Sequence, residues 1–129
     1  MNYLSQKKGF LGYDAKQKTE NKVVVVPFGL EKTVSYGAGT KNGPREIIKA
    51  SHQVELFDEE FNNEPYKQIG FRTIKPIKIK KKIIAALNQL SKINEEIISQ
   101  QKFPIVFGGE HSITVGSIKP FTKKYKEII

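Results

Sequence analysis

One short segment of the chain places residue types that can do chemistry at a defined position. Phe103 to Phe107 is a fully apolar run typical of a strand, and Gly108, Gly109, Glu110, His111 and Ser112 follow it directly. Ligands of an open parallel sheet bind outside the carboxyl ends of its strands, so this turn is predicted to deliver an imidazole and a carboxylate to that edge. The two glycines permit the sharp backbone turn. A neutral imidazole placed there can ligate a divalent metal ion through one ring nitrogen.

A single histidine does not make a metal site, because structural and catalytic metals need three or four protein ligands. The remaining His and Asp residues are His52, Asp14 and Asp58, and none of them follows a matching strand end. His52 is expected at the surface beside a short helix. Spacing alone leaves two interpretations of His111 open: a metal ligand or catalytic group, and a hydrogen-bonded structural histidine in a strand-to-helix turn.

A second loop is rich in glycine but carries a weaker signal. The run from Ser35 and Tyr36 to Thr40 lacks both the Lys-Ser/Thr ending of a P-loop and the G-x-G-x-x-G spacing of a dinucleotide fold, so a phosphate cradle is disfavoured. The acidic run Asp58 to Glu60 is interpreted as a solvated turn. No role is assigned to Glu95 and Glu96, which are expected to face water.

The elements that position these residues alternate between strand and helix. Val23 to Phe28 is a β-branched run that predicts a strand buried on both faces, as in a parallel sheet, and the same is expected of Phe103 to Phe107. A helix is predicted to start at Pro44, and an amphipathic helix to run from Ile79 to about Gln100. This βαβ order predicts the α/β class, with a mostly parallel sheet.

Other segments give less defined expectations. Val54–Asp58 and Ile69–Ile74 are each expected to be a strand or an extended connection. Ser112 is predicted to cap a short helix that ends at Pro120. Residues 1–21 are interpreted as an irregular N-terminal arm, and Ile128 and Ile129 as the start of another buried strand.

Composition excludes several classes of protein. The 129 residues contain no cysteine, which excludes disulfide scaffolds, thiolate metal sites and cysteine nucleophiles and agrees with a cytoplasmic location. Neither a bilayer-spanning apolar stretch nor a signal peptide is present, so no membrane association is expected.

The formal net charge of +9 invites a nucleic-acid interpretation, but the lysines gather in two clusters without interleaved aromatic residues. We therefore expect a solvated basic face and no nucleic-acid partner. The clusters comprise Lys75, Lys78, Lys80, Lys81 and Lys82, and Lys119, Lys123, Lys124 and Lys126.

Several motifs taken together resemble the N-terminal part of proteins of the ureohydrolase family, which includes agmatinases, arginases and formimidoylglutamases. They are Val26-Pro27-Phe28, the loop Val34 to Ile47 with its Ser-Tyr-x-x-Gly-Thr sequence, Glu64-Pro65-Tyr66, and Gly108 to Thr114. Glu110 and the Glu-Pro-Tyr segment look more like agmatinases than arginases.

The resemblance implies a three-layer α/β/α fold, of which this chain is a part, with two manganese ions at the strand ends. It implies hydrolysis of agmatine to putrescine and urea by a metal-bridging hydroxide, in an enzyme that forms homo-oligomers. It also implies that His111 is a metal ligand, that Gly108, Gly109, Glu110 and Ser112 shape the site, and that Ser35 and Tyr36 lie on the substrate side.

The family's later Asp-Ala-His-x-Asp and Ser-x-Asp-x-Asp motifs are absent from the sequence. Residues 22–129 are therefore expected to be the N-terminal portion of a single ureohydrolase domain, truncated at its C-terminal end and inactive by itself. Arginine and guanidinobutyrate stay open as substrates. A non-catalytic remnant or interaction module of the same fold is the alternative.

Overall fold

A parallel sheet forms the middle of the molecule. In the computed structural model, which describes residues 1–14 and 20–126, the sheet consists of β1 (Val23–Phe28), β2 (Phe71–Thr73) and β3 (Phe103–Gly108) in the order β2-β1-β3. Both pairings are parallel, with Val25 opposite Thr73 in β2 and Ile105 in β3. The predicted α/β class and parallel sheet are confirmed.

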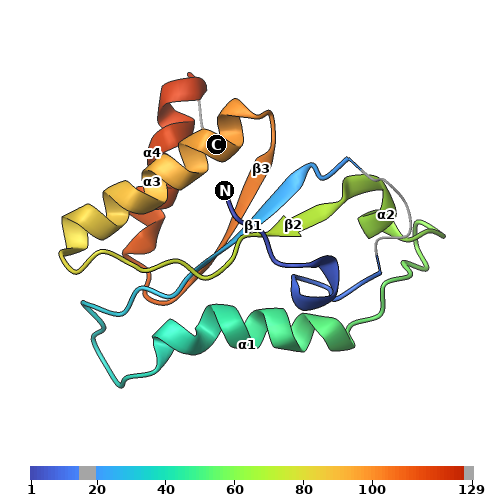
Figure 1. Cartoon of the computed structure of the whole chain (residues 1–129), viewed down its shortest axis with the longest axis horizontal. Coiled ribbons are helices and arrows are strands. Elements are labelled where there is room, and N and C mark those ends of the chain that lie inside the picture. Colours follow the sequence, from blue (N-terminus) through green and yellow to red (C-terminus); the bar gives the residue numbers. More distant parts are fainter. Residues whose placement is uncertain (15–19, 127–129) are drawn as a thin grey trace.

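Helices cover both faces of this sheet and complete three layers (Figure 1). Helix α1 (Gly43–Ala50) lies on one side, and α3 (Ile83–Ser99) and α4 (Ile113–Lys124) pack together on the other. A short helix, α2 (Pro65–Ile69), precedes β2, and single 3-10 turns occur at Gln6–Lys8, Thr40–Asn42 and Ser51–Gln53. Among the described residues, no helix combines the length and apolar character needed to cross a bilayer.

The core lies between β1 and the long helix α3. Val24, Val26 and Phe28 of β1 are fully buried and pack with Leu90 and Ile97 of α3. Every residue of β1 is buried except Pro27, which is half-buried. The prediction of a central strand with two covered faces is confirmed for β1, whose β-branched side chains suit that position.

Strand β3 is less buried than β1. Within the described chain β3 pairs with β1 alone, so it is an edge strand. Phe103 is 57% exposed, and of the other β3 residues only Pro104 is buried. The apolar sequence of β3 is thus more hydrophobic than its surroundings in this structure require.

Two helix boundaries differ from the predicted ones. Helix α3 begins at Ile83 rather than Ile79, so Lys80, Lys81 and Lys82 stay outside its first turn, where positive charge is unfavourable. The extended segment before it is fixed instead by Gln89, whose side chain bonds the Lys80 N–H and the Lys78 carbonyl, each at 3.0 Å.

Helix α4 does not end at Pro120 but continues through it to Lys124. A proline inside a helix costs about 3 kcal/mol. Burial of Pro120 and the packing of the Phe121 ring, 6.1 Å from that of Phe103, offset this cost. The helix therefore persists where propensity alone would end it.

Two weakly patterned segments are now defined. Of Ile69–Ile74, only Phe71–Thr73 is strand, and Val54–Asp58 is extended with a single bridge from Asp58 to Asn63. The predicted strand at residues 128–129 lies outside the described residues.

The described part of the N-terminal segment lies beside the sheet. Tyr3 forms an antiparallel bridge with Ile74, and the Phe10 ring contacts the rings of Phe71 and Phe107 at 5.4 and 5.3 Å. Exposed His52 helps to hold it, since its Nε2 lies 2.8 Å from the Gly9 carbonyl oxygen. The division into an arm (1–21) and a domain (22–129) stays a prediction.

Candidate functional site

The turn that follows β3 packs tightly against the loop that follows β1. The N–H of Glu110 donates to the carbonyl of Leu30 at 2.9 Å. A β-carbon on Gly109 would overlap the carbonyl oxygen of Leu30, so no larger residue fits without a backbone shift. Glycine at this position thus permits the close approach of two strand ends.

Glu110 is the anchor of this arrangement. The residue is 5% exposed, and its Oε2 accepts the backbone N–H groups of Lys32 and of Thr33, the latter at 2.7 Å. Oε1 accepts the hydroxyl groups of Thr33, at 2.7 Å, and of Ser112, at 2.6 Å. Four donors therefore converge on one carboxylate, and we call this set of contacts the Glu110 clamp.

These donors determine the charge state of Glu110. Burial by itself raises the pKa of a carboxyl group, because it disfavours the charged form. The hydrogen bonds from Ser112, Thr33 and Lys32 outweigh burial and lower the pKa of Glu110 to about 2. Glu110 is accordingly an anion at every physiological pH.

Ser112 does not act as predicted. It directly precedes α4, as expected of a capping residue, but it makes no side-chain cap hydrogen bond. Its hydroxyl is directed to Glu110 instead. A charged acceptor makes a stronger hydrogen bond than the neutral pairing of a cap, which accounts for the difference.

His111 lies in the sequence between Glu110 and Ser112, and it is exposed. In the part of the chain that the structure describes, no group of three or more His, Cys, Asp or Glu side chains could hold a metal ion. The lone pairs of Glu110 are already occupied by donors. The residues present therefore do not by themselves fit a manganese centre, and His111 is a single candidate ligand.

The loop after β1 has its own brace, formed by Glu31. Its Oε2 accepts the backbone N–H groups of Gly39, at 2.6 Å, and of Lys41, at 3.1 Å, and its Oε1 lies 3.6 Å from Lys41 Nζ. The Lys41 N–H contributes most to lowering the pKa of Glu31. The left-handed φ of 113° at Gly39 completes the turn.

Ser35 and Tyr36 lie on this braced loop, two and three residues beyond Thr33. Tyr36 is 99% exposed, and no hydrogen bond joins either residue to His111 among the described contacts. The structure thus brings Gly108–Ser112 together with Lys32 and Thr33, while Ser35 and Tyr36 face solvent. Their place on the substrate side stays a prediction.

The sequence interpretation did not identify Glu31, Lys32 and Thr33. A carboxylate three residues after the end of a buried strand, beside a loop with several glycines, was the available signal for Glu31. Lys32 and Thr33 carried no such signal. Lys32 contacts Glu110 through its backbone N–H, and so does Thr33 in one of its two hydrogen bonds. Such contacts depend on loop conformation and not on side-chain type.

Comparison with known proteins identifies relatives of this chain. A protein-family model described as the Arginase family matches residues 21–129. The N(1)-aminopropylagmatine ureohydrolase of Synechocystis sp. is 33% identical over 110 residues, which cover 81% of this chain and 36% of that protein. The agmatinase of Bacillus cereus is 27% identical over 113 residues, covering 84% of this chain and 38% of that protein.

Solved structures show the same fold. The agmatine ureohydrolase of Thermoplasma volcanium superposes with a TM-score of 0.67 at 24% identity, covering 91% of this chain and 39% of its own. Formimidoylglutamase of Bacillus subtilis gives a TM-score of 0.69 at 16% identity, covering 94% of this chain and 38% of its own. The chain thus spans a little over a third of the length of the relatives it matches. Because the family model extends over most of the sequence, this protein belongs to the arginase family.

Proposed function

We propose that this chain forms the N-terminal part of a ureohydrolase that acts on a guanidino compound, with agmatine as the first candidate substrate. The observation that carries the proposal is the exposed position of His111 at the carboxyl end of β3, on a turn fixed by the Glu110 clamp. Relatives named agmatinase and N(1)-aminopropylagmatine ureohydrolase support the substrate class.

In this proposal His111 supplies one ligand to a manganese centre, and Glu110 positions it without touching the metal. The other ligands come from residues beyond those of this chain. Manganese and similar ions need several ligands, and carboxylates to offset their charge, so His111 cannot hold two ions alone. We therefore expect the 129-residue chain to release no urea when it is assayed by itself.

The test is a hybrid in which this chain replaces the matching N-terminal part of the Synechocystis relative. We expect the hybrid to bind manganese and to release urea from agmatine or N(1)-aminopropylagmatine. The His111→Ala variant should lose metal and activity together. His52→Ala is the matched control, because His52 is the other histidine of the chain and lies outside the turn.

Two results would contradict the proposal. A folded hybrid with unchanged manganese content after His111→Ala would remove His111 from the metal site. A folded hybrid that binds manganese but hydrolyses no guanidino compound would favour the alternative of a non-catalytic module with the family's architecture.

A further inference from the structure

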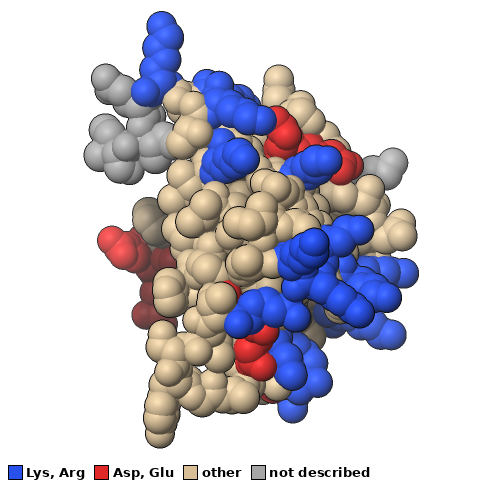
Figure 2. Space-filling model, turned by 90° about the vertical axis from the view of Figure 1, so that its left-hand side faces the viewer, with Lys and Arg blue, Asp and Glu red and all other residues tan. Residues whose placement is uncertain are grey.

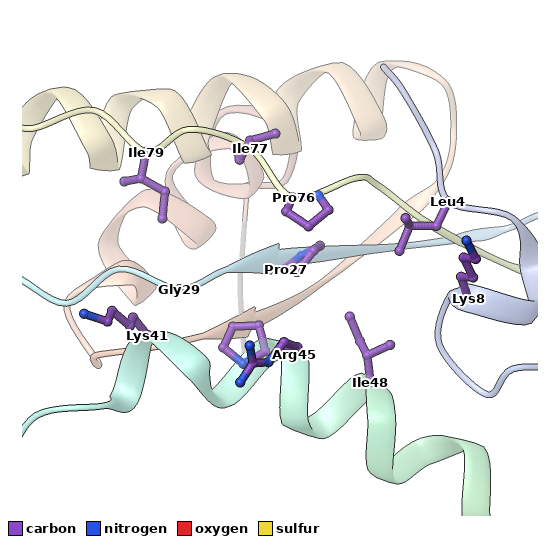
Figure 3. A pocket seen from close by; sticks show the side chains of 11 residues that line it. Leu4, Lys8, Pro27, Gly29, Lys41, Arg45, Ile48, Pro76, Ile77 and Ile79 are labelled. Carbon is purple, nitrogen blue, oxygen red and sulfur yellow. The ribbon is translucent and has the colours of Figure 1, made fainter.

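One concave site of the molecule is lined by neither Glu110 nor His111. It is a cavity of about 410 Å³ between α1, the end of β1 and the extended segment that precedes α3. In Figure 3, Ile79 from that segment and Ile48 from α1 point into the opening from opposite sides, with Pro27 of β1 between them. This volume is within the range of small-molecule pockets.

The cavity exists because the ladder between β1 and β2 cannot continue. Val23 donates to the Gly70 carbonyl at 3.2 Å, and the Val25 carbonyl accepts from Ile74 at 3.0 Å. The next bonds in this parallel register would need the N–H groups of Pro27 and Pro76, which do not exist. Strand β1 and the segment that follows β2 separate at this point, and Pro27 is the one residue of β1 that is not buried.

The walls of the cavity are mostly apolar, and the charged side chains that line it are all positive. Leu4, Ile48, Ile77 and Ile79 contribute alkyl groups, and three prolines contribute rings. The charged residues that line it are Lys8, Lys41 and Arg45, and no lining residue carries a carboxylate. Lys41 pairs with Glu31 and Arg45 with Glu46, whereas Lys8 forms no ion pair among the described residues.

The wider surface adds to this positive field. No Asp or Glu occurs between Pro65 and Asn94, a stretch that supplies one wall of the cavity and holds all of the first lysine cluster. Figure 2 shows lysine and arginine side chains gathered toward the right-hand side and the top of the face in view. Such a field concentrates anions near an apolar opening.

We propose that this cavity binds a small organic anion with an apolar body, such as a medium-chain carboxylate. The apolar part would fill the space over Pro27, and the carboxylate would lie at the rim near Lys8 and Arg45. This site does not depend on the proposed ureohydrolase function, because neither His111 nor Glu110 lines it.

Octanoate is the probe, and calorimetric titration of the 129-residue chain is the measurement, with amide chemical-shift mapping to locate the ligand. We expect saturable binding with shifts at Ile48, Ile77 and Ile79. Replacing both rim cations by Lys8→Gln and Arg45→Gln should weaken binding about five- to tenfold. Octanol, which has the same chain without the charge, should bind less tightly than octanoate.

Two further variants make the test specific. Ile79→Trp should fill the space and abolish binding while all cations remain. Lys49→Gln, on α1 but outside the cavity lining, should leave the affinity unchanged. Absence of saturable octanoate binding, equal affinity for octanol, or affinity that is insensitive to Ile79→Trp in a variant with a folded amide spectrum would each overturn the proposal.

Discussion

The hydroxyl group of Ser112 donates to Oε1 of Glu110 at 2.6 Å, across the single residue His111. This bond replaces a helix cap and links the start of α4 to the carboxylate that anchors the loop after β1. The backbone on both sides of His111 is therefore fixed, although the imidazole itself is exposed. A side chain held in this way can meet a ligand with little loss of conformational entropy.

Removing the charge of the clamp should destabilise the fold. Glu110→Gln leaves one neutral acceptor oxygen where four donors converge, so every donor loses a charged partner and those that face the new amide nitrogen lose their acceptor. We expect the free energy of unfolding to fall by about 1–3 kcal/mol in urea denaturation. Glu59→Gln, at an exposed position, is the control and should change stability by less than about 0.5 kcal/mol. Equal stability of Glu110→Gln and wild type would show that the clamp contributes nothing.

The clamp should also make stability depend on pH in the acid range. The folded-state pKa of Glu110, about 2, lies below its ordinary value of 4.5. The stabilisation is therefore fully present above about pH 4.5 and is lost as pH falls toward 2. The difference in unfolding free energy between wild type and Glu110→Gln should be constant from pH 7 to 5 and shrink below about pH 4. A difference that grows on acidification would contradict this assignment.

Much of the site's framework follows from the sequence, because its signals are local. The β-branched run of β1, the two glycines at the end of β3 and the proline in the first turn of α1 each reflect a backbone requirement of their own segment. These signals correctly place the turn Gly108–Ser112 at the carboxyl end of a parallel strand.

What the sequence does not reveal depends on contacts between distant segments. Glu110 contacts Lys32 and Thr33 across sequence separations of 78 and 77 residues, and part of this contact uses backbone N–H groups that any residue has. The continuation of α4 through Pro120 likewise depends on packing that local propensity does not contain. Tertiary contacts override local preference in both places.

Close packing at Gly109 gives a further prediction. Gly109→Ala would force a β-carbon against the Leu30 carbonyl, whereas nothing lies within 4 Å of a β-carbon built on Gly37. We expect Gly109→Ala to cost more than about 3 kcal/mol, or to prevent cooperative unfolding, by analogy with severe overpacking. Gly37→Ala, the control, should cost only the strain of its left-handed φ of 66°, about 1–2 kcal/mol. Equal effects in thermal unfolding would show that the loop after β1 yields easily.

The open edge of β3 should promote association of the chain. Phe103 is 57% exposed beside a strand edge that has no partner among the described residues, and such edges pair with other chains. We expect sedimentation velocity to show concentration-dependent oligomers of wild type and a larger monomer fraction after Phe103→Lys, because a lysine on an edge strand opposes strand addition. Phe61→Lys, which replaces a phenylalanine of 67% exposure in a turn far from the sheet edge in sequence, is the matched control and should leave association unchanged. Equal effects of the two substitutions would attribute association to charge or general hydrophobicity and not to β3. A wild-type chain that stays monomeric at high concentration would show that this edge does not promote association.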